Sequence, residues 1–426
     1  MRPRGARPRL REARAARNVA RRGVSLSWPE VPLPGGGLTS HSAAAPRALY
    51  LHVPFCVRRC AYCDFAVQAT REAPTDAWLA AVAGEMRLLA AERGWVDPLA
   101  LDTVYVGGGT PSMLAPGAMA ELRDRLAPFA TWNEGAEWTC EANPESFTAA
   151  IAADWRAAGV NRISLGAQTF HEPALRWMGR LHGVDGPRRA MDAARSAGFG
   201  NVSVDLIFGL PARLGRDWGA DLHHTLTLEP EHVSLYGLTA EAAAPLGRWV
   251  MEGRETLADD DRYADEFLLA HTCLAAAGFR HYEVSNFGLP GRESRHNRVY
   301  WTGAPYAALG PGSHAFYPPL RRWNVRSWDA YRDAVAAARL PTDDEEVVDD
   351  ETRVLERVWL GLRTDTGYPL GDACEAELRL AQRWRDAGRA RIDGAAVRLT
   401  AEGWLLLDTL AVEMAAAAEG RMAPAR

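Results

Sequence analysis

The chain has 426 residues, of which 47% are hydrophobic and 24% charged, and a formal net charge of −5. It has no run of about 18 apolar residues and no apolar segment of the signal-peptide kind at its N-terminus, so we expect no transmembrane helix and a cytoplasmic location. All 49 basic residues are arginine. This excludes a Schiff-base lysine, a pyridoxal phosphate site and a P-loop lysine. No nucleic-acid partner is predicted.

Residues 1–46 are predicted to form a disordered tail. Nine arginines fall there against two acids, and the stretch from Trp28 to Pro46 is rich in Pro, Gly and Ser. A solvated tail, or a start codon placed too early, is favoured over an arm that binds an anionic membrane surface or a partner.

From residue 47 onward, short apolar runs alternate with helical stretches rich in Ala, Leu and Arg. The predicted strands are Leu49–Pro54, Thr103–Val106, Trp138–Glu141, Arg162–Gly166, Val202–Phe208 and His232–Leu238. The predicted helices between them are Trp78–Arg93, Ala118–Phe129, Ala149–Ala158, Gly186–Ala197 and Trp218–Leu226. Six such units predict a parallel sheet with outer helices. In a barrel-like sheet, functional groups are expected at the C-terminal ends of the strands.

Beyond about residue 240 the pattern loosens. A helix is expected over Tyr263–Ala277 and a strand over Tyr282–Val284, followed by a Gly/Pro/aromatic region. The acidic run Asp343–Glu351 indicates a linker or an exposed helix start. Helical patterns surround a small hairpin, Ala390–Leu399, turning at Asp393–Gly394. The predicted divisions are a core over 47–285, an extension over 286–340 and a C-terminal helical domain over 341–426.

Three of the six cysteines lie within eight residues, as Cys56-x3-Cys60-x2-Cys63 after the first predicted strand. Three thiolates in one short loop are typical of metal ligation in a chain without an export signal. They can hold an iron–sulfur cluster and leave one iron without a protein ligand. The alternative is zinc bound by the three cysteines and His52. His52 lies inside a predicted strand, where it is poorly placed to join the loop.

The cysteine spacing resembles the signature of the radical S-adenosylmethionine (SAM) superfamily. Its flanks resemble the HemN/HemW family, which holds coproporphyrinogen dehydrogenases and related heme chaperones, over roughly residues 48 to 420. The resemblance implies an α/β fold, a partial (β/α)6 TIM-like barrel with an α-rich, winged-helix-like C-terminal domain. It also implies a 4Fe-4S cluster on the three cysteines. In this family SAM chelates the open iron, and the reduced cluster cleaves its sulfonium bond.

Further residues at the predicted strand ends match the family's SAM site. Gly107-Gly108-Gly109 by itself is also compatible with a tight turn, although consecutive glycines let backbone N–H groups approach a ligand. An acid at 205, inside an apolar strand, is costly unless it is paired or bound to a ligand. By resemblance, the SAM site comprises Tyr50, Gly108, Gly109, Thr110, Glu141, Gln168, Arg180, Asp205 and Thr239. Each match is weak alone, but their shared order is specific.

Two features distinguish the branches of the family. Dehydrogenases carry a fourth cysteine two residues after the third, where this chain has Phe65. The chain also contains a motif, HNxxYW, associated with heme binding in the chaperones. Imidazole is a common axial heme ligand, and the aromatic rings supply flat faces for a porphyrin. The predicted heme residues are His296, Asn297, Tyr300 and Trp301. A structural histidine packed near two aromatic rings is the alternative, and His314 is a second candidate imidazole.

The resulting hypothesis is a heme chaperone that binds a 4Fe-4S cluster, SAM and heme. Its expected partners are heme, an unidentified heme-acceptor protein and a flavodoxin- or ferredoxin-like reductant. Two alternatives are retained: an oxygen-independent coproporphyrinogen III dehydrogenase, and a zinc-stabilised binding module without catalysis.

Overall fold

A single nine-stranded sheet organises most of the chain. The computed structural model describes residues 45–419, so almost all of the predicted 1–46 tail lies outside the described residues. The strand order is β11-β1-β4-β5-β6-β7-β8-β10-β9. The strands are β1 (Ala48–Val53), β4 (Leu99–Gly108), β5 (Ala130–Ala142), β6 (Arg162–Gln168), β7 (Val202–Phe208), β8 (His232–Gly237), β9 (Arg280–Glu283), β10 (Asn286–Gly288) and β11 (Ala307–Leu309).

The six strands predicted from the sequence form the centre of this sheet. β1, β4, β5, β6, β7 and β8 pair in chain order, and each pair is parallel. β11 adds a parallel strand beside β1, whereas β10 and β9 are antiparallel at the opposite edge. Within residues 45–419 the edge strands β11 and β9 do not pair, so the sheet is open there. The predicted α/β fold, with a parallel central sheet, is confirmed.

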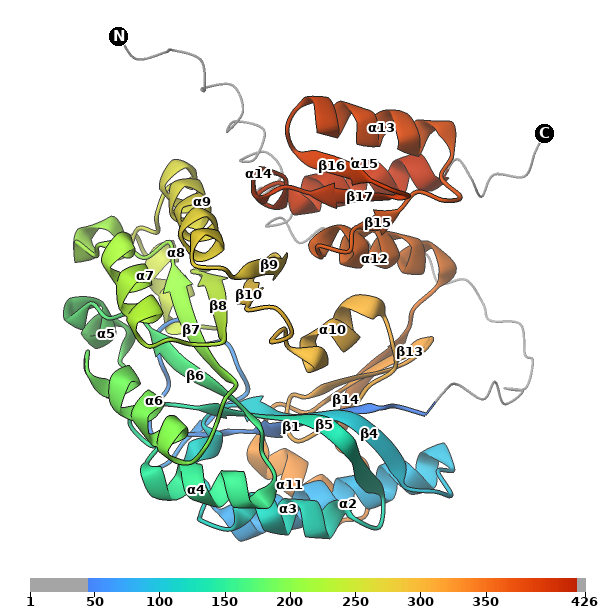
Figure 1. Cartoon of the computed structure of the whole chain (residues 1–426). Coiled ribbons are helices and arrows are strands. Elements are labelled where there is room, and N and C mark those ends of the chain that lie inside the picture. The colour runs from blue at the N-terminus through green and yellow to red at the C-terminus, as the bar shows by residue number, and fades with distance from the viewer. Residues whose placement is uncertain (1–44, 420–426) are drawn as a thin grey trace. The chain divides into compact units, whose positions relative to one another are not determined.

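Helices cover the outer side of the sheet, while α10 lies on its inner side (Figure 1). Local sequence sets their ends: Thr148 caps α4 by accepting a hydrogen bond from the Ile151 N–H, and Gly159, at φ +107°, ends that helix. The helices are α2 (Thr75–Arg93), α3 (Ala118–Leu126), α4 (Ala149–Ala158), α5 (Glu172–Met178), α6 (Gly186–Ser196), α7 (Trp218–Thr227), α8 (Pro245–Met251), α9 (Asp260–Ala276), α10 (Arg295–Thr302) and α11 (Trp328–Ala336).

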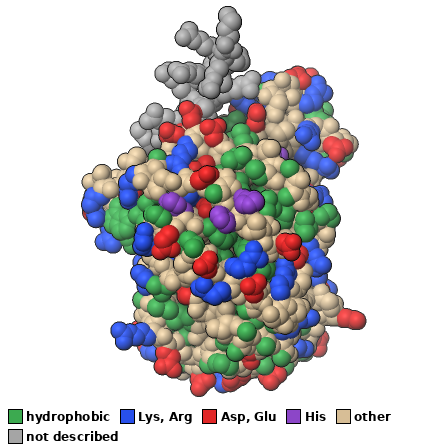
Figure 2. Space-filling model, turned by 60° about the vertical axis from the view of Figure 1, so that its left-hand side comes forward, with side chains coloured by type: hydrophobic (Ala, Val, Ile, Leu, Met, Phe, Trp, Pro, Cys, Tyr) green, Lys and Arg blue, Asp and Glu red, His purple; other side chains and the backbone are tan. Residues whose placement is uncertain are grey.

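The side of the molecule that carries α5, α6 and α7 has a mixed surface (Figure 2). Acidic and arginine side chains are interspersed on the face that Figure 2 shows, with scattered apolar groups between them. The inward side of these elements is apolar. In β7 every residue is buried except the half-buried Asp205, as expected for a parallel strand covered on both faces.

The acidic run at 343–351 is neither a linker nor simply a helix start. Thr342–Val347 forms β14, which pairs with β13 (Leu320–Asn324), and β13 pairs with β12 (His314–Tyr317). The acids are tolerated in a strand because Arg322 on β13 forms ion pairs with Glu345 (3.1 Å) and with Glu92 of α2 (2.7 Å). The isolated sequence run gives no sign of these partners.

The chain divides into two compact units between Arg353 and Val354 rather than near residue 340, because β14 pairs within the larger unit. In its described residues, up to 419, the smaller unit contains four helices and a three-stranded antiparallel sheet in which the predicted hairpin is present. Its two loop residues are Gly394 and Ala395. Its elements are α12 (Asp350–Arg363, which spans the division), β15 (Tyr368–Pro369), α13 (Glu375–Asp386), β16 (Ala390–Asp393), β17 (Ala396–Leu399), α14 (Ala401–Trp404) and α15 (Leu407–Glu419).

Candidate cofactor-binding site

A cavity of about 380 Å³ lies where the C-terminal ends of the parallel strands meet the cysteine loop. This volume suits a bound small molecule. Ten of the twelve residues predicted for the cluster and SAM line it, although they come from seven separate places in the sequence. They are Cys56, Cys60, Cys63, Gly108, Gly109, Glu141, Gln168, Arg180, Asp205 and Thr239.

Two predicted residues do not line the cavity. Tyr50 lies in the middle of β1, and its hydroxyl hydrogen-bonds to Nδ1 of His52 (3.0 Å). The Thr110 hydroxyl donates to Sγ of Cys56 (3.4 Å) and accepts from Nδ2 of Asn143 (3.0 Å), so it supports the site from behind. The sequence prediction missed several lining residues, although their positions at strand ends were a usable signal. These include Asn143, Glu145, Ser164, Gly166, Ile207 and Tyr236.

The cysteine loop is fixed by backbone hydrogen bonds to distant segments. β2 (Phe55–Cys56) pairs with β3 (Gln68–Ala69), which closes the loop. The Ala61 N–H donates to the Met178 carbonyl (3.3 Å), and the Ala61 carbonyl accepts from the Leu246 N–H (2.8 Å). Burial raises the pKa of the Cys56 thiol to about 11. Because metal ligation requires the thiolate, cluster binding here would displace protons.

The zinc alternative does not fit this geometry. Both ring nitrogens of His52 are engaged: Nε2 lies 2.8 Å from the Ala66 carbonyl and Nδ1 3.0 Å from the Tyr50 hydroxyl. Across residues 45–419, no three His, Cys, Asp or Glu side chains converge as ligands of a single metal ion. In a 4Fe-4S cluster each thiolate binds a different iron, so the cysteines need not converge on one point. The residues present therefore fit a cluster better than a Cys3His zinc ion.

The triple glycine permits close packing between β4 and the cysteine loop. A Cβ on Gly108, which has φ +108°, would lie 2.4 Å from the His52 ring, and one on Gly109 would lie 2.6 Å from the Phe55 carbonyl oxygen. The Gly108 N–H donates to Glu141 (2.9 Å), and the Gly109 N–H donates to the Val53 carbonyl (2.7 Å). Both amides are therefore already used, and the glycines shape the cavity wall.

Two carboxylates face the cavity. Glu141 accepts hydrogen bonds from the Tyr105 hydroxyl (2.8 Å) and the Gly108 N–H, and burial raises its pKa to about 7. Asp205 accepts from the hydroxyls of Ser164 (2.8 Å) and Ser203 (2.9 Å), and burial raises its pKa also. These hydroxyls explain how the acid is accommodated in an apolar strand. A cationic or hydroxyl-bearing ligand would stabilise both ionised carboxylates.

Gln168 and Arg180 complete the wall. Gln168 has φ +67°, a left-handed conformation that a non-glycine residue rarely adopts. Nη2 of Arg180 donates to Oδ1 of Asn143 (2.7 Å) and to the Gly166 carbonyl (2.7 Å). Its Nε is buried and has no hydrogen-bond partner in the described part of the chain. Arg180 lines the cavity, where its positive charge suits an anionic group of a ligand.

The raised pKa of Glu141 predicts a pH-dependent effect of Glu141→Gln. The folded protein holds this proton up to about pH 7, whereas the unfolded chain releases it near pH 4.5, so stability falls as the pH rises between these values. Without SAM, the free energy of unfolding of the variant should exceed that of the wild type by about 2 kcal/mol near pH 8. This is less than the full pKa shift of Glu141 implies, because the cavity admits water. Denaturant unfolding should show the gain shrinking toward about pH 5. An equal gain at both pH values would contradict this assignment.

The HNxxYW segment forms α10 and lies outside the cavity. His296 is fully buried, with Nδ1 2.9 Å from the Thr103 hydroxyl and Nε2 2.8 Å from the Tyr300 hydroxyl. Burial lowers its pKa to about 3. The Asn297 N–H donates to Ser294, which caps the helix, and Trp301 is half-buried. This is the arrangement of the structural alternative, in which neither ring nitrogen of the histidine is available to a ligand.

His314, the second candidate imidazole, is exposed on β12 and stacks on Trp323 at 5.7 Å between ring centroids. It does not line the cavity. No helix in the described residues is long and apolar enough to cross a membrane.

The chain is similar to known proteins in sequence and in fold. The Radical SAM superfamily model matches residues 50–222. The chain is 38% identical over 371 residues to the heme chaperone HemW of Mycobacterium tuberculosis (strain CDC 1551 / Oshkosh), covering 86% of this chain and 94% of the relative. It is 33% identical over 322 residues to HemW of Bacillus subtilis (strain 168), covering 75% and 84%.

The fold is similar to the solved structure of coproporphyrinogen III oxidase (HemN) from Escherichia coli, a radical SAM enzyme. The TM-score is 0.73 at 19% identity, over 87% of this chain and 90% of that chain, which shows the fold alone. The fold and the matched region define a radical SAM protein. Within that superfamily, the chain belongs to the HemW family. Membership implies a 4Fe-4S cluster and SAM.

Proposed function

We propose that this chain is a heme chaperone whose cavity holds a 4Fe-4S cluster on Cys56, Cys60 and Cys63, with SAM beside it. The observation that carries the proposal is the cavity itself, where the three cysteines meet the strand-end residues of the superfamily's SAM site. When bound, the reduced cluster would supply an electron to the sulfonium group of SAM. The six free cysteines suit a reducing, cytoplasmic compartment.

Each part of SAM has a chemical counterpart in this cavity. Arg180 provides a positive charge for the carboxylate, and Glu141 and Asp205 are acceptors for the amino group and the ribose hydroxyls. Apolar side chains such as Ile207 and Leu238 provide a surface for the adenine ring. The chain's own role is to bind and orient these groups and to limit the access of water.

The heme-binding part of the proposal rests on the HemW relatives and on the HNxxYW segment. His296, Asn297, Tyr300 and Trp301 lie together on α10, and His296 is the only one of them with a ligating imidazole. For His296 to ligate heme, it has to separate from Thr103, which lies on β4, and from the Tyr300 hydroxyl, which lies on α10 itself. We therefore propose that heme binding is coupled to a displacement of α10, and that the heme is then passed to an acceptor protein.

This coupling predicts opposite effects for two substitutions. Tyr300→Phe keeps the flat ring but removes the hydroxyl that occupies Nε2 of His296, so heme affinity should rise about fivefold, the equivalent of roughly 1 kcal/mol for one hydrogen bond. His296→Ala should abolish the imidazole-ligated heme spectrum. Heme titration followed by absorbance measures both. Unchanged affinity in both variants would assign His296 a purely structural role and remove it from the heme site.

An activity assay separates the chaperone from the dehydrogenase. The reconstituted protein, incubated with coproporphyrinogen III, a reductant such as reduced flavodoxin, and SAM, should form no product, because Phe65 stands where the dehydrogenases carry a fourth cysteine. Product formation at rates typical of enzymes, about 1 per second or more, would overturn the chaperone proposal.

A further inference from the structure

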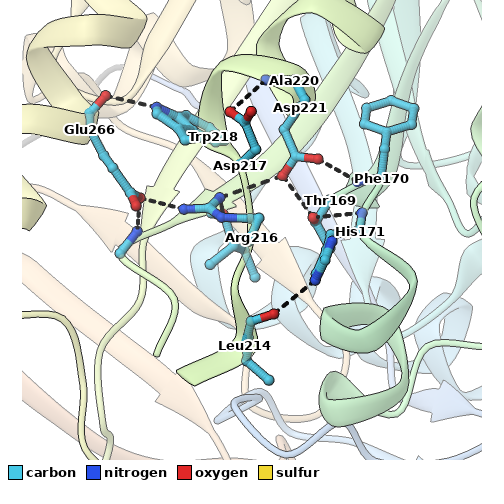
Figure 3. A network of polar contacts seen from close by, with 12 residues as sticks. Thr169, Phe170, His171, Leu214, Arg216, Asp217, Trp218, Ala220, Asp221 and Glu266 are labelled. Atoms are coloured by element: carbon cyan, nitrogen blue, oxygen red, sulfur yellow. Dashed lines mark hydrogen bonds and ion pairs between the residues drawn. The ribbon is translucent and has the colours of Figure 1, made fainter. Parts of the chain in front are cut away.

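A buried ion-pair cluster lies outside the lining of the cavity (Figure 3). Arg216 precedes α7, Asp221 lies in the first turn of α7, and Glu266 lies on α9. Their side chains are 0%, 3% and 8% exposed. Arg216 pairs with both acids and also lies over the Trp218 ring at 4.6 Å. Charged side chains buried this deeply are expected to hold neighbouring segments in place.

Asp221 holds the turn that follows Gln168. One of its carboxylate oxygens accepts from the Thr169 hydroxyl (2.7 Å), and the other accepts from the Phe170 N–H (2.8 Å). Thr169 is fully buried, so the first of these bonds is shielded from water. Both residues directly after Gln168 are therefore anchored to a single carboxylate, as Figure 3 shows.

Arg216 extends the same anchor to the neighbouring strand. Its Nη1 donates to the Ile207 carbonyl (3.0 Å) near the end of β7. Glu266, its ion-pair partner, accepts from the Gly209 N–H (2.7 Å) just beyond that strand. One guanidinium thus connects the ends of β6 and β7, and each of these strand ends contributes a side chain to the cavity, Gln168 and Ile207.

Gln168 needs such an anchor. Within residues 45–419 the non-glycine residues with positive φ are Gln168, Glu229 and Ala338, and Gln168 is the one that lines the cavity. A left-handed conformation at a non-glycine residue persists only where the surroundings impose it, and it is common where a side chain must face a ligand. The two bonds to Asp221 fix the backbone directly after this strained residue.

We propose that Asp221, held by Arg216, is a positioning residue that fixes Gln168 in the orientation in which it contacts SAM. This inference rests on the proposed function, in which SAM occupies the cavity. Asp221 itself contacts neither the cavity nor its occupant. It acts through the Thr169–Phe170 turn.

The test is a SAM titration of the reconstituted, reduced holoprotein, followed by the change in the electron paramagnetic resonance (EPR) spectrum of the cluster. Asp221→Asn removes the charge and one acceptor, and it should raise the Kd for SAM about tenfold while iron content stays unchanged. Thr169→Val removes one of the two hydrogen bonds that hold the turn to Asp221, together with the acceptor of the His171 N–H (3.1 Å), and should give a smaller rise. It remains informative if Asp221→Asn fails to fold.

A double-mutant cycle distinguishes positioning from general loss of stability. If Asp221 acts through Gln168, Asp221→Asn combined with Gln168→Ala should bind SAM no more weakly than Gln168→Ala alone. The matched control is Asp217→Ala, which removes the N-cap of α7. It should lower the melting temperature and leave the Kd unchanged.

Three outcomes would overturn the inference. An unchanged Kd in folded Asp221→Asn and Thr169→Val variants would show that the turn does not act on the site. Effects of Asp221→Asn and Gln168→Ala that multiply would show that they act independently. A wild-type cluster whose spectrum does not respond to SAM would refute the proposed occupant of the cavity, and this inference with it.

Discussion

Replacing Cys60 with alanine should yield a folded protein that cannot retain its cluster. Cys60 lies in the middle of the loop, between the two other cysteines that line the cavity. Two remaining thiolates leave two irons of a 4Fe-4S cluster without protein ligands, so iron and sulfide content after anaerobic reconstitution should fall almost to zero. The loop should persist, because β2–β3 pairing and the backbone bonds of Ala61 hold it without the thiol.

The control for this experiment is Cys273→Ala. Cys273 is a half-buried, free thiol on α9, outside the cavity, so this variant should bind as much iron and sulfide as the wild type. An equal loss of iron and sulfide in both variants would mean that the iron binds to the thiols of the chain non-specifically. Full retention of the cluster in Cys60→Ala would show that the cysteine loop does not hold the cluster.

Gly109→Ala should cause a large loss of stability. The added Cβ would lie 2.6 Å from the Phe55 carbonyl oxygen and 2.7 Å from the Val53 carbonyl oxygen. Both are backbone atoms, so no side chain can rotate away, and β4 or the cysteine loop has to shift. We expect a loss of about 3 kcal/mol in the free energy of unfolding, together with reduced cluster content.

Gly200→Ala provides the matched comparison, because a Cβ at Gly200 meets no atom within 4 Å. It should be neutral or stabilising by about 0.5 kcal/mol, through the reduced entropy of the unfolded chain. Denaturant unfolding and iron analysis of both variants measure the difference. A Gly109→Ala variant as stable and as iron-rich as Gly200→Ala would show that this close packing is not required.

Sequence reasoning identified the central sheet because its strands carry local signals. Val202–Phe208 and Ala149–Ala158 were predicted to the residue, since the first is mostly apolar and the second has clear caps. β5 was predicted much too short, because residues 133–135 are polar or glycine and hide the fact that Ala130–Trp132 pairs with Leu99–Leu101 of β4. The short helix α5 was missed for lack of a long periodic pattern.

The residues of the candidate site were easier to predict than the buried residues that hold them in place. Residues at strand ends converge by topology, so a motif at each end locates the cavity without knowledge of its geometry. The burial of His296 against Thr103, 193 residues away, has no local signal. The same applies to Arg216 and Glu266, 50 residues apart in sequence, whose pairing depends on how α7 and α9 pack. The burial of His296 and the pairing of Arg216 with Glu266 therefore depend on long-range polar contacts, which the motifs alone do not predict.

The most direct test of the central claim is the EPR spectrum of the anaerobically reconstituted and reduced protein, recorded with and without SAM. The protein should contain about four irons and four sulfides per chain. It should give a reduced-cluster signal that changes clearly when SAM binds the open iron. A protein that takes up stoichiometric zinc in place of iron and sulfide, or a cluster signal that SAM leaves unchanged, would contradict the central claim.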